Sequence, residues 1–167
     1  LLDAVTSETG PASIESHYDE AMSVPGLLAA VRQGELDGVD GYVIACFGDP
    51  GLDAARELAA GPVIGIAEAA MQTASHLGRG FSVVTTLGRT VGRAADLAER
   101  YGMGRFCRGI HACELPVLAL DTDPAARAIV TEACRAAVAA DGSDAVVLGC
   151  AGMAELCAPC ARRSGYR

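Results

Sequence analysis

The sequence predicts an α/β protein with parallel sheets flanked by helices, arranged as two similar lobes around a cleft. Short apolar runs rich in β-branched residues alternate with helical stretches, which is typical of parallel strands joined by helical crossovers. Residues 40–46 and 144–150 also share one pattern, in which an aspartate, an apolar strand and a small residue precede a cysteine. This repeat predicts two lobes, which we place at 1–78 and 79–167.

Length, charge and composition narrow the possible functions. The 167 residues can bury a core, and the net charge of −8 argues against a nucleic-acid partner. No apolar run is long enough to cross a membrane. The seven cysteines lack the spacing of a disulfide scaffold, which favours reduced thiols in the cytoplasm. We expect no metal site, because Cys157 with Cys160, and Cys107 with His111 and Cys113, each lack further ligands.

Three strands are expected in the first half of the chain. The run 42–45 is short and apolar, which predicts a strand buried on both faces. Asp49 and Pro50 have the residue types of an N-cap and a first helical position for the helix that follows. Pro25 and Gly26 are expected to separate two helices. In this half we expect strands at 2–6, 42–45 and 63–66, and helices at 17–23, 27–34, 52–60 and 67–77.

The second half continues the alternation. We expect strands at 81–85 and 145–148 and helices at 90–101 and 125–140, with a short helical stretch at 153–156. The segment 106–120 is ambiguous, and its most strand-like part is 117–120.

A cysteine stands at the carboxyl end of each repeated strand. In open α/β sheets this edge is where ligands bind. One cysteine there is often only a small packed side chain, but matched positions predict that Cys46 and Cys150 face each other. We expect the following helices to lower the thiol pKa toward neutrality. A thiolate and a thiol on opposite faces of a carbon form a two-base racemase that needs neither cofactor nor metal. A redox disulfide between the two cysteines is the rival chemistry.

Loops at two other strand ends are candidate binding elements. Thr85 and Thr86 offer hydroxyl and N–H groups suited to a carbonyl or an imide, although threonine is also common at strand ends. Pro11, Ser13 and Ile14 follow the expected strand 2–6 and are placed on the rim of the cleft. The alternative for this segment is a Gly-Pro turn with Ser13 as a helix cap.

Four segments, 10–16, 46–51, 84–87 and 148–153, together resemble the hydantoin racemases of the aspartate/glutamate racemase superfamily. The resemblance runs from about residue 5 to about residue 156. It implies a two-lobed α/β fold, Cys46 and Cys150 as the acid–base pair, a 5-substituted hydantoin or allantoin as substrate, and a homo-oligomer. The residues expected to bind the substrate are Pro11, Ser13, Ile14, Phe47, Gly48, Thr85, Thr86, Gly149, Ala151 and Gly152.

Members of this family begin with a further strand and an Asn-Pro-Asn-Thr-type loop, and continue beyond the second cysteine through a strand and a long helix. The present sequence matches neither part, so we expect it to be incomplete at both ends.

Two other functions are compatible with the sequence. The first is a decarboxylase or a cis–trans isomerase of the same superfamily. Decarboxylases that resemble this fold retain only one of the two cysteines, so the presence of both favours racemisation. The second is a flavodoxin-like ligand-binding module in which the thiols have no catalytic role.

Overall fold

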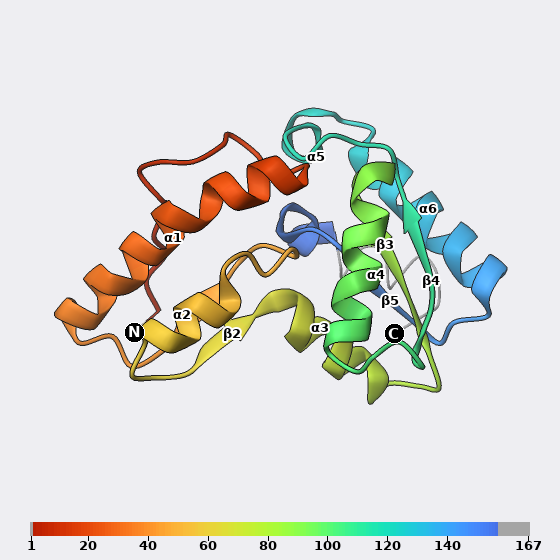
Figure 1. The fold of residues 1–167 in the computed structure, drawn as a ribbon. Coiled ribbons are helices and arrows are strands. Elements are labelled where there is room, and N and C mark those ends of the chain that lie inside the picture. The colour runs from red at the N-terminus through yellow and green to blue at the C-terminus, as the bar shows by residue number, and fades with distance from the viewer. Residues whose placement is uncertain (1, 157–167) are drawn as a thin grey trace.

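The chain forms two parallel β-sheets joined and covered by helices (Figure 1). The structure is a computed structural model that describes residues 2–156. Every strand pairing is parallel, as predicted. One sheet has the order β1-β2 and the other β4-β3-β5; the strands are β1 Tyr42–Ile44, β2 Val63–Gly65, β3 Phe81–Thr85, β4 Cys107–Ala112 and β5 Ala145–Leu148.

Helices connect the strands, and most of them begin and end close to the predicted positions. The helices are α1 His17–Asp37, α2 Leu52–Leu58, α3 Ile66–Ser75, α4 Val91–Arg100, α5 Ala119–Thr122 and α6 Ala126–Asp141, with 3-10 turns η1 Gly88–Thr90 and η2 Ala151–Leu156. Within the described residues no helix is both long and apolar enough to span a bilayer.

The three-stranded sheet is buried on both faces. All five residues of its central strand β3 are buried. Phe81 and Val83 pack against α3 and α4, whereas Val84 packs on the opposite side against α6. Side chains of successive strand residues point to opposite faces, so this alternation places one core on each side of the sheet.

The two-stranded sheet is covered on one face only. Ile44 and Val63 form a core with α1 and α2, whereas Val43 and Ile64 are 57% and 46% exposed. These two residues pair in register, so they lie side by side on the open face. The prediction that 42–45 is buried on both faces was therefore wrong, because no helix of the described residues covers the second face.

Helix α1 differs from the prediction, since it runs without a break through Pro25. The expected break was wrong: Gly26 lies inside the helix and packs closely there, since a Cβ at this position would lie 2.5 Å from the Thr9 carbonyl oxygen. The N-cap is Ser16 and not Ser13. The Ser16 hydroxyl accepts from Asp19 N at 3.1 Å and donates to Asp19 Oδ2 at 2.7 Å, which closes the first turn.

Two strand predictions were also wrong. Residues 2–6 are exposed and form no strand, because no other described segment pairs with them. In the ambiguous segment the strand is β4, next to β3, and not 117–120, which leads into α5. Leu120 enters the core beside α6. A short apolar run buried in this way cannot be distinguished from a strand by periodicity alone.

Helix α3 links the two sheets. It follows β2 in the chain, yet its buried residues Ala67, Met71 and Ala74 belong to the core beneath the three-stranded sheet. The division into lobes at 1–78 and 79–167 stays a proposal, in which Cys46 follows a strand of the first lobe and Cys150 a strand of the second.

Candidate functional site

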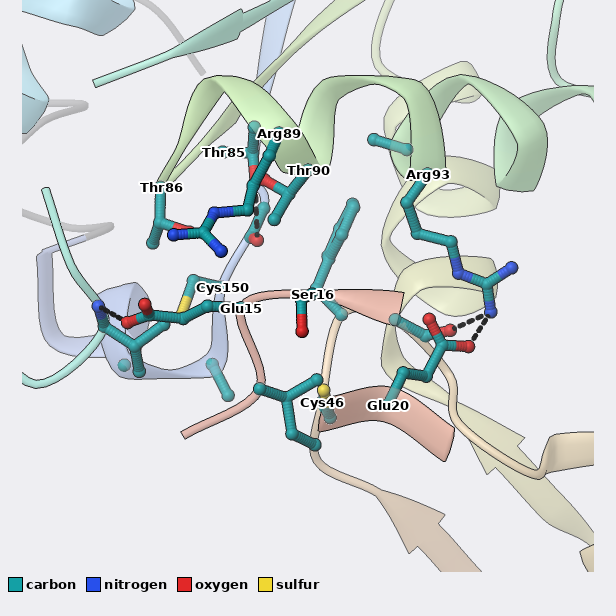
Figure 2. A pocket seen from close by; sticks show the side chains of 18 of the residues that line it. Glu15, Ser16, Glu20, Cys46, Thr85, Thr86, Arg89, Thr90, Arg93 and Cys150 are labelled. Carbon is teal, nitrogen blue, oxygen red and sulfur yellow. Dashed lines mark hydrogen bonds and ion pairs between the residues drawn. The ribbon is translucent and has the colours of Figure 1, made fainter. Parts of the chain in front are cut away.

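A pocket of about 310 Å³ opens where the carboxyl ends of β1, β3 and β5 meet. Its walls come from the start of α1, the loop after β1, the η1–α4 segment and the loop after β5. Cys46 and Cys150 both line it, and Figure 2 shows their sulfur atoms on separate segments. Two thiols that follow strands of different sheets therefore line the same pocket.

The two cysteine loops share one backbone hydrogen bond. Each cysteine stands two residues beyond its strand, and its carbonyl accepts a hydrogen bond from the residue three positions on. That residue is Asp49 in the first loop and Met153 in the second, and both hydrogen bonds measure 3.0 Å. The repeated pattern in the sequence thus corresponds to a repeated turn.

The repeated aspartates do not share a role. The Asp144 carboxylate accepts from Arg79 N at 2.7 Å and from Gly80 N at 3.2 Å, which ties the start of β3 to β5. Asp40, by contrast, lies exposed before β1.

Burial raises the pKa of both cysteine thiols above the ordinary value. The backbone N–H of Gly48 at Cys46, and that of Gly152 at Cys150, lower the pKa by a smaller amount. The expectation that helix N-termini bring the thiol pKa toward neutrality was wrong, because desolvation outweighs the N–H groups. Both thiols are therefore mainly protonated at neutral pH.

Negative charges around the pocket act in the same direction as burial. Glu20 and Asp49 raise the pKa of Cys46, and Glu15 raises that of Cys150. A thiolate at Cys150 also raises the pKa of Cys46. Loss of a proton from one thiol therefore disfavours loss from the other, so the singly ionised pair is the favoured charged state.

Charged side chains line both ends of the pocket. Arg93 pairs with Glu20 and donates to the Gly48 carbonyl at 2.9 Å. Glu15 accepts from Val117 N at 2.8 Å. Arg89 makes no hydrogen bond or ion pair with any residue that the structure describes, and Figure 2 shows its side chain extending toward the segment that carries Cys150. Its charge acts on the Asp19 carboxylate, and its guanidinium has no hydrogen-bond partner among the described residues.

The hydroxyl groups of the two predicted threonines differ in whether they already have a hydrogen-bond partner. The Thr85 hydroxyl is already paired, with Thr90 Oγ1 at 2.8 Å and with the Gly149 carbonyl at 3.5 Å. The Thr86 hydroxyl has no partner among residues 2–156. Thr85 thus holds the wall of the pocket together, and Thr86 has a hydroxyl to offer.

Most of the residues predicted from the sequence come together here. Pro11 and Ser13 lie outside the lining, and Phe47 contributes to the wall while its side chain is buried in the core. The predicted residues that line the pocket are Ile14, Cys46, Phe47, Gly48, Thr85, Thr86, Gly149, Cys150, Ala151 and Gly152.

The sequence did not predict the wall of the pocket that the η1–α4 segment forms. Arg89, Arg93 and Leu97 follow helical spacing, so they lie on one face of the η1–α4 segment and line the pocket. This spacing, next to the Thr85–Thr86 loop, was the signal that could have found them. The other missed residues are Glu15, Ser16, His17, Glu20, Ala45, Thr90, Ala94 and Val117.

The cysteines outside the pocket form no recognisable centre within the described part of the chain. Within residues 2–156 no disulfide joins any two of Cys46, Cys107, Cys113, Cys134 and Cys150. No group of three or more potential ligands in residues 2–156 could hold a metal ion. Cys157 and Cys160 lie outside the described residues.

The fold and the pocket define an α/β protein with a paired-thiol site at the edge of its parallel sheets. The chain belongs to the Asp/Glu/Hydantoin racemase family, whose model matches residues 1–167. A hydantoin racemase from Rhizobium meliloti is 59% identical over 148 residues, which cover 88% of this chain and 61% of the relative. The chain thus spans about three fifths of that relative's length.

Two solved structures share the fold closely. Allantoin racemase from Klebsiella pneumoniae is 52% identical with a TM-score of 0.93, over 96% of this chain and 66% of that one. Allantoin racemase from Pseudomonas fluorescens is 30% identical with a TM-score of 0.88, over 98% of this chain and 70% of that one.

Proposed function

We propose that the chain racemises a 5-substituted hydantoin or allantoin, with Cys46 and Cys150 as its two acid–base groups. The observation that carries this proposal is the position of both thiols in one pocket of about 310 Å³. The names of the similar proteins, hydantoin racemase and allantoin racemase, support this substrate class. In this mechanism the substrate ring lies between the sulfur atoms.

The reaction is a proton transfer in two steps. A thiolate on one side takes the proton from C5, so an S–H bond forms and the C–H electron pair moves into the neighbouring carbonyl as an enolate. The opposite thiol then protonates C5 from the other face and becomes the thiolate. Nothing is oxidised or reduced, and the two cysteines have exchanged roles.

The enolate oxygen needs a hydrogen-bond donor or a positive charge. The guanidinium of Arg89 and the hydroxyl of Thr86, which has no partner among residues 2–156, supply both on one wall of the pocket. We assign them this role. Neither group takes part in the proton transfer itself.

A polarimetric assay tests the proposal. The chain should bring L- and D-forms of a 5-substituted hydantoin, and of allantoin, to zero optical rotation with no change in composition. Dialysis against EDTA should leave the rate unchanged, because the mechanism uses no metal. Absence of inversion with all these substrates, or a rate that returns only when a divalent metal is added, would contradict the proposal.

The pH dependence follows from the raised pKa of both thiols. Because catalysis needs one thiolate, kcat/KM should rise about tenfold per pH unit through neutrality and bend only above the ordinary cysteine pKa of about 8.5. Initial rates from pH 6 to 10, corrected for the uncatalysed reaction, measure this profile. A plateau that begins below pH 7 would show that the thiolate is already formed and that a different group limits the rate.

A further inference from the structure

Asp49 is a buried carboxylate that lies just beyond the first cysteine. It is 3% exposed. Its oxygens accept from Ala67 N at 3.0 Å, from Glu68 N at 3.0 Å and from the Tyr101 hydroxyl at 2.8 Å. The sequence suggested that Asp49 caps α2, but the N-cap of α2 is Gly51. The carboxylate instead accepts from two N–H groups in the first turn of α3, where a negative charge is favourable.

The backbone at Asp49 has a positive φ, a conformation that residues other than glycine rarely adopt. Its φ is 46°, and its N–H closes the turn onto the Cys46 carbonyl at 3.0 Å. Such a conformation persists only where the surroundings fix it. The three hydrogen bonds of the carboxylate provide that restraint, so they hold the turn that carries Cys46.

Tyr101 connects this turn to the opposite side of the pocket. It stands directly after α4, and its ring packs against the cores of both sheets. The same α4 segment holds the turn a second time, because Arg93 donates to the Gly48 carbonyl. The position of Cys46 relative to the three-stranded sheet, and so to Cys150, depends on these contacts.

The second cysteine turn is held by different means. Met153 occupies the position equivalent to Asp49, and it is fully buried among apolar residues of the core next to α6. One turn is therefore held by hydrogen bonds to a carboxylate and the other by apolar packing. Loss of the polar contacts affects only the first turn.

We infer that Asp49 and Tyr101 are positioning residues for Cys46, which set its place opposite Cys150 without touching the substrate. The inference rests on the proposed function for its catalytic consequence. A variant that loosens this contact should therefore impair proton removal by Cys46 and spare proton removal by Cys150.

The test is Tyr101→Phe, which keeps the ring and removes only the hydroxyl. Loss of the C5 proton from each enantiomer is followed by NMR in D₂O. Cys46→Ser defines which enantiomer depends on Cys46. For that enantiomer Tyr101→Phe should slow proton loss about tenfold, and for the other by less than about twofold. Asp49→Asn should shift the ratio in the same direction. Each enantiomer is assayed separately with the same protein preparation, so the ratio of the two rates does not depend on the folded fraction.

Tyr42→Phe is the matched control. It removes a hydroxyl that donates to the Glu35 carboxylate at 2.7 Å, away from the pocket lining. This variant should leave the ratio of the two exchange rates unchanged. Equal slowing of both enantiomers by Tyr101→Phe, slowing of the Cys150-dependent enantiomer alone, or an unchanged ratio would each overturn the inference.

A second measurement separates this inference from the proposed function. Iodoacetamide alkylation of Cys46 and Cys150, followed by peptide mass spectrometry, needs no catalysis. Tyr101→Phe should speed alkylation of Cys46 several-fold, because its turn is less restrained and more open, and leave Cys150 unchanged. Unchanged Cys46 alkylation would overturn the positioning role. Faster Cys46 alkylation with no exchange of either enantiomer by the wild-type chain would overturn the proposed function alone.

Discussion

Replacing Cys46 or Cys150 by serine should reduce racemisation by about 10²- to 10⁴-fold, which is the range that general acid–base groups contribute. Serine keeps the shape of the side chain, but its hydroxyl is a far weaker acid than a thiol. It can neither become the base nor readily return a proton. Inversion needs both groups, so each single variant should lose it.

Solvent exchange should distinguish the two variants. Each enantiomer presents its proton to a different cysteine, so Cys46→Ser should block deuterium exchange of one enantiomer and Cys150→Ser that of the other. NMR of both enantiomers in D₂O, with circular dichroism as a check on folding, measures this. Equal loss of exchange for both enantiomers in two folded variants would favour a structural role for the thiols. Full racemase activity in either variant would rule out the assignment.

Substitution of Gly65, where β2 meets α3, by alanine is expected to destabilise the protein strongly. Its backbone has ordinary φ and ψ values of −86° and 134°, so an alanine suits the conformation. An added Cβ, however, would lie 2.6 Å from Asp49 Oδ1. The buried carboxylate has no room to yield, so Gly65→Ala should lower the free energy of unfolding by about 1–3 kcal/mol. Urea unfolding of both proteins measures the difference.

Gly92→Ala is the matched control for this substitution. Gly92 lies inside α4, and an added Cβ there would meet nothing within 4 Å. Alanine favours a helix more than glycine does, but Gly92 is the second residue of α4, so this variant should be more stable by only up to about 0.5 kcal/mol. A neutral Gly65→Ala variant would contradict the tight fit around Asp49.

Much of the fold could be predicted from the sequence. The boundaries of β3 and β5 agree with the structure, because each is a short apolar run bounded by turn residues. The break expected at Pro25 did not occur: α1 continues through it, and Gly26 packs closely against the Thr9 carbonyl instead of ending a helix. The strand β4 was missed because its partly polar residues lie at the edge of the sheet.

Part of the candidate site could be predicted from the sequence for the same reason. Strand ends could be located, so Cys46, Cys150 and their neighbours could be placed in one pocket. The missed wall of α4 required knowledge of which helix packs beside which strand. The raised pKa of the thiols could not be predicted from the sequence either, because it depends on how far folding buries each sulfur atom away from water. Asp49 resembles an ordinary helix cap until α3 and Tyr101 are seen to surround it.

The fate of the C5 proton during the first turnovers in D₂O tests the two-thiol mechanism most directly. Each enantiomer is incubated with the chain and stopped at low conversion, and the deuterium content of the inverted product and of the remaining substrate is measured by NMR. Two bases on opposite faces predict a product that carries deuterium at C5, while the remaining substrate still carries mostly protium. A product that retains the substrate's own proton would show that a single group moves it between faces, and would contradict the account.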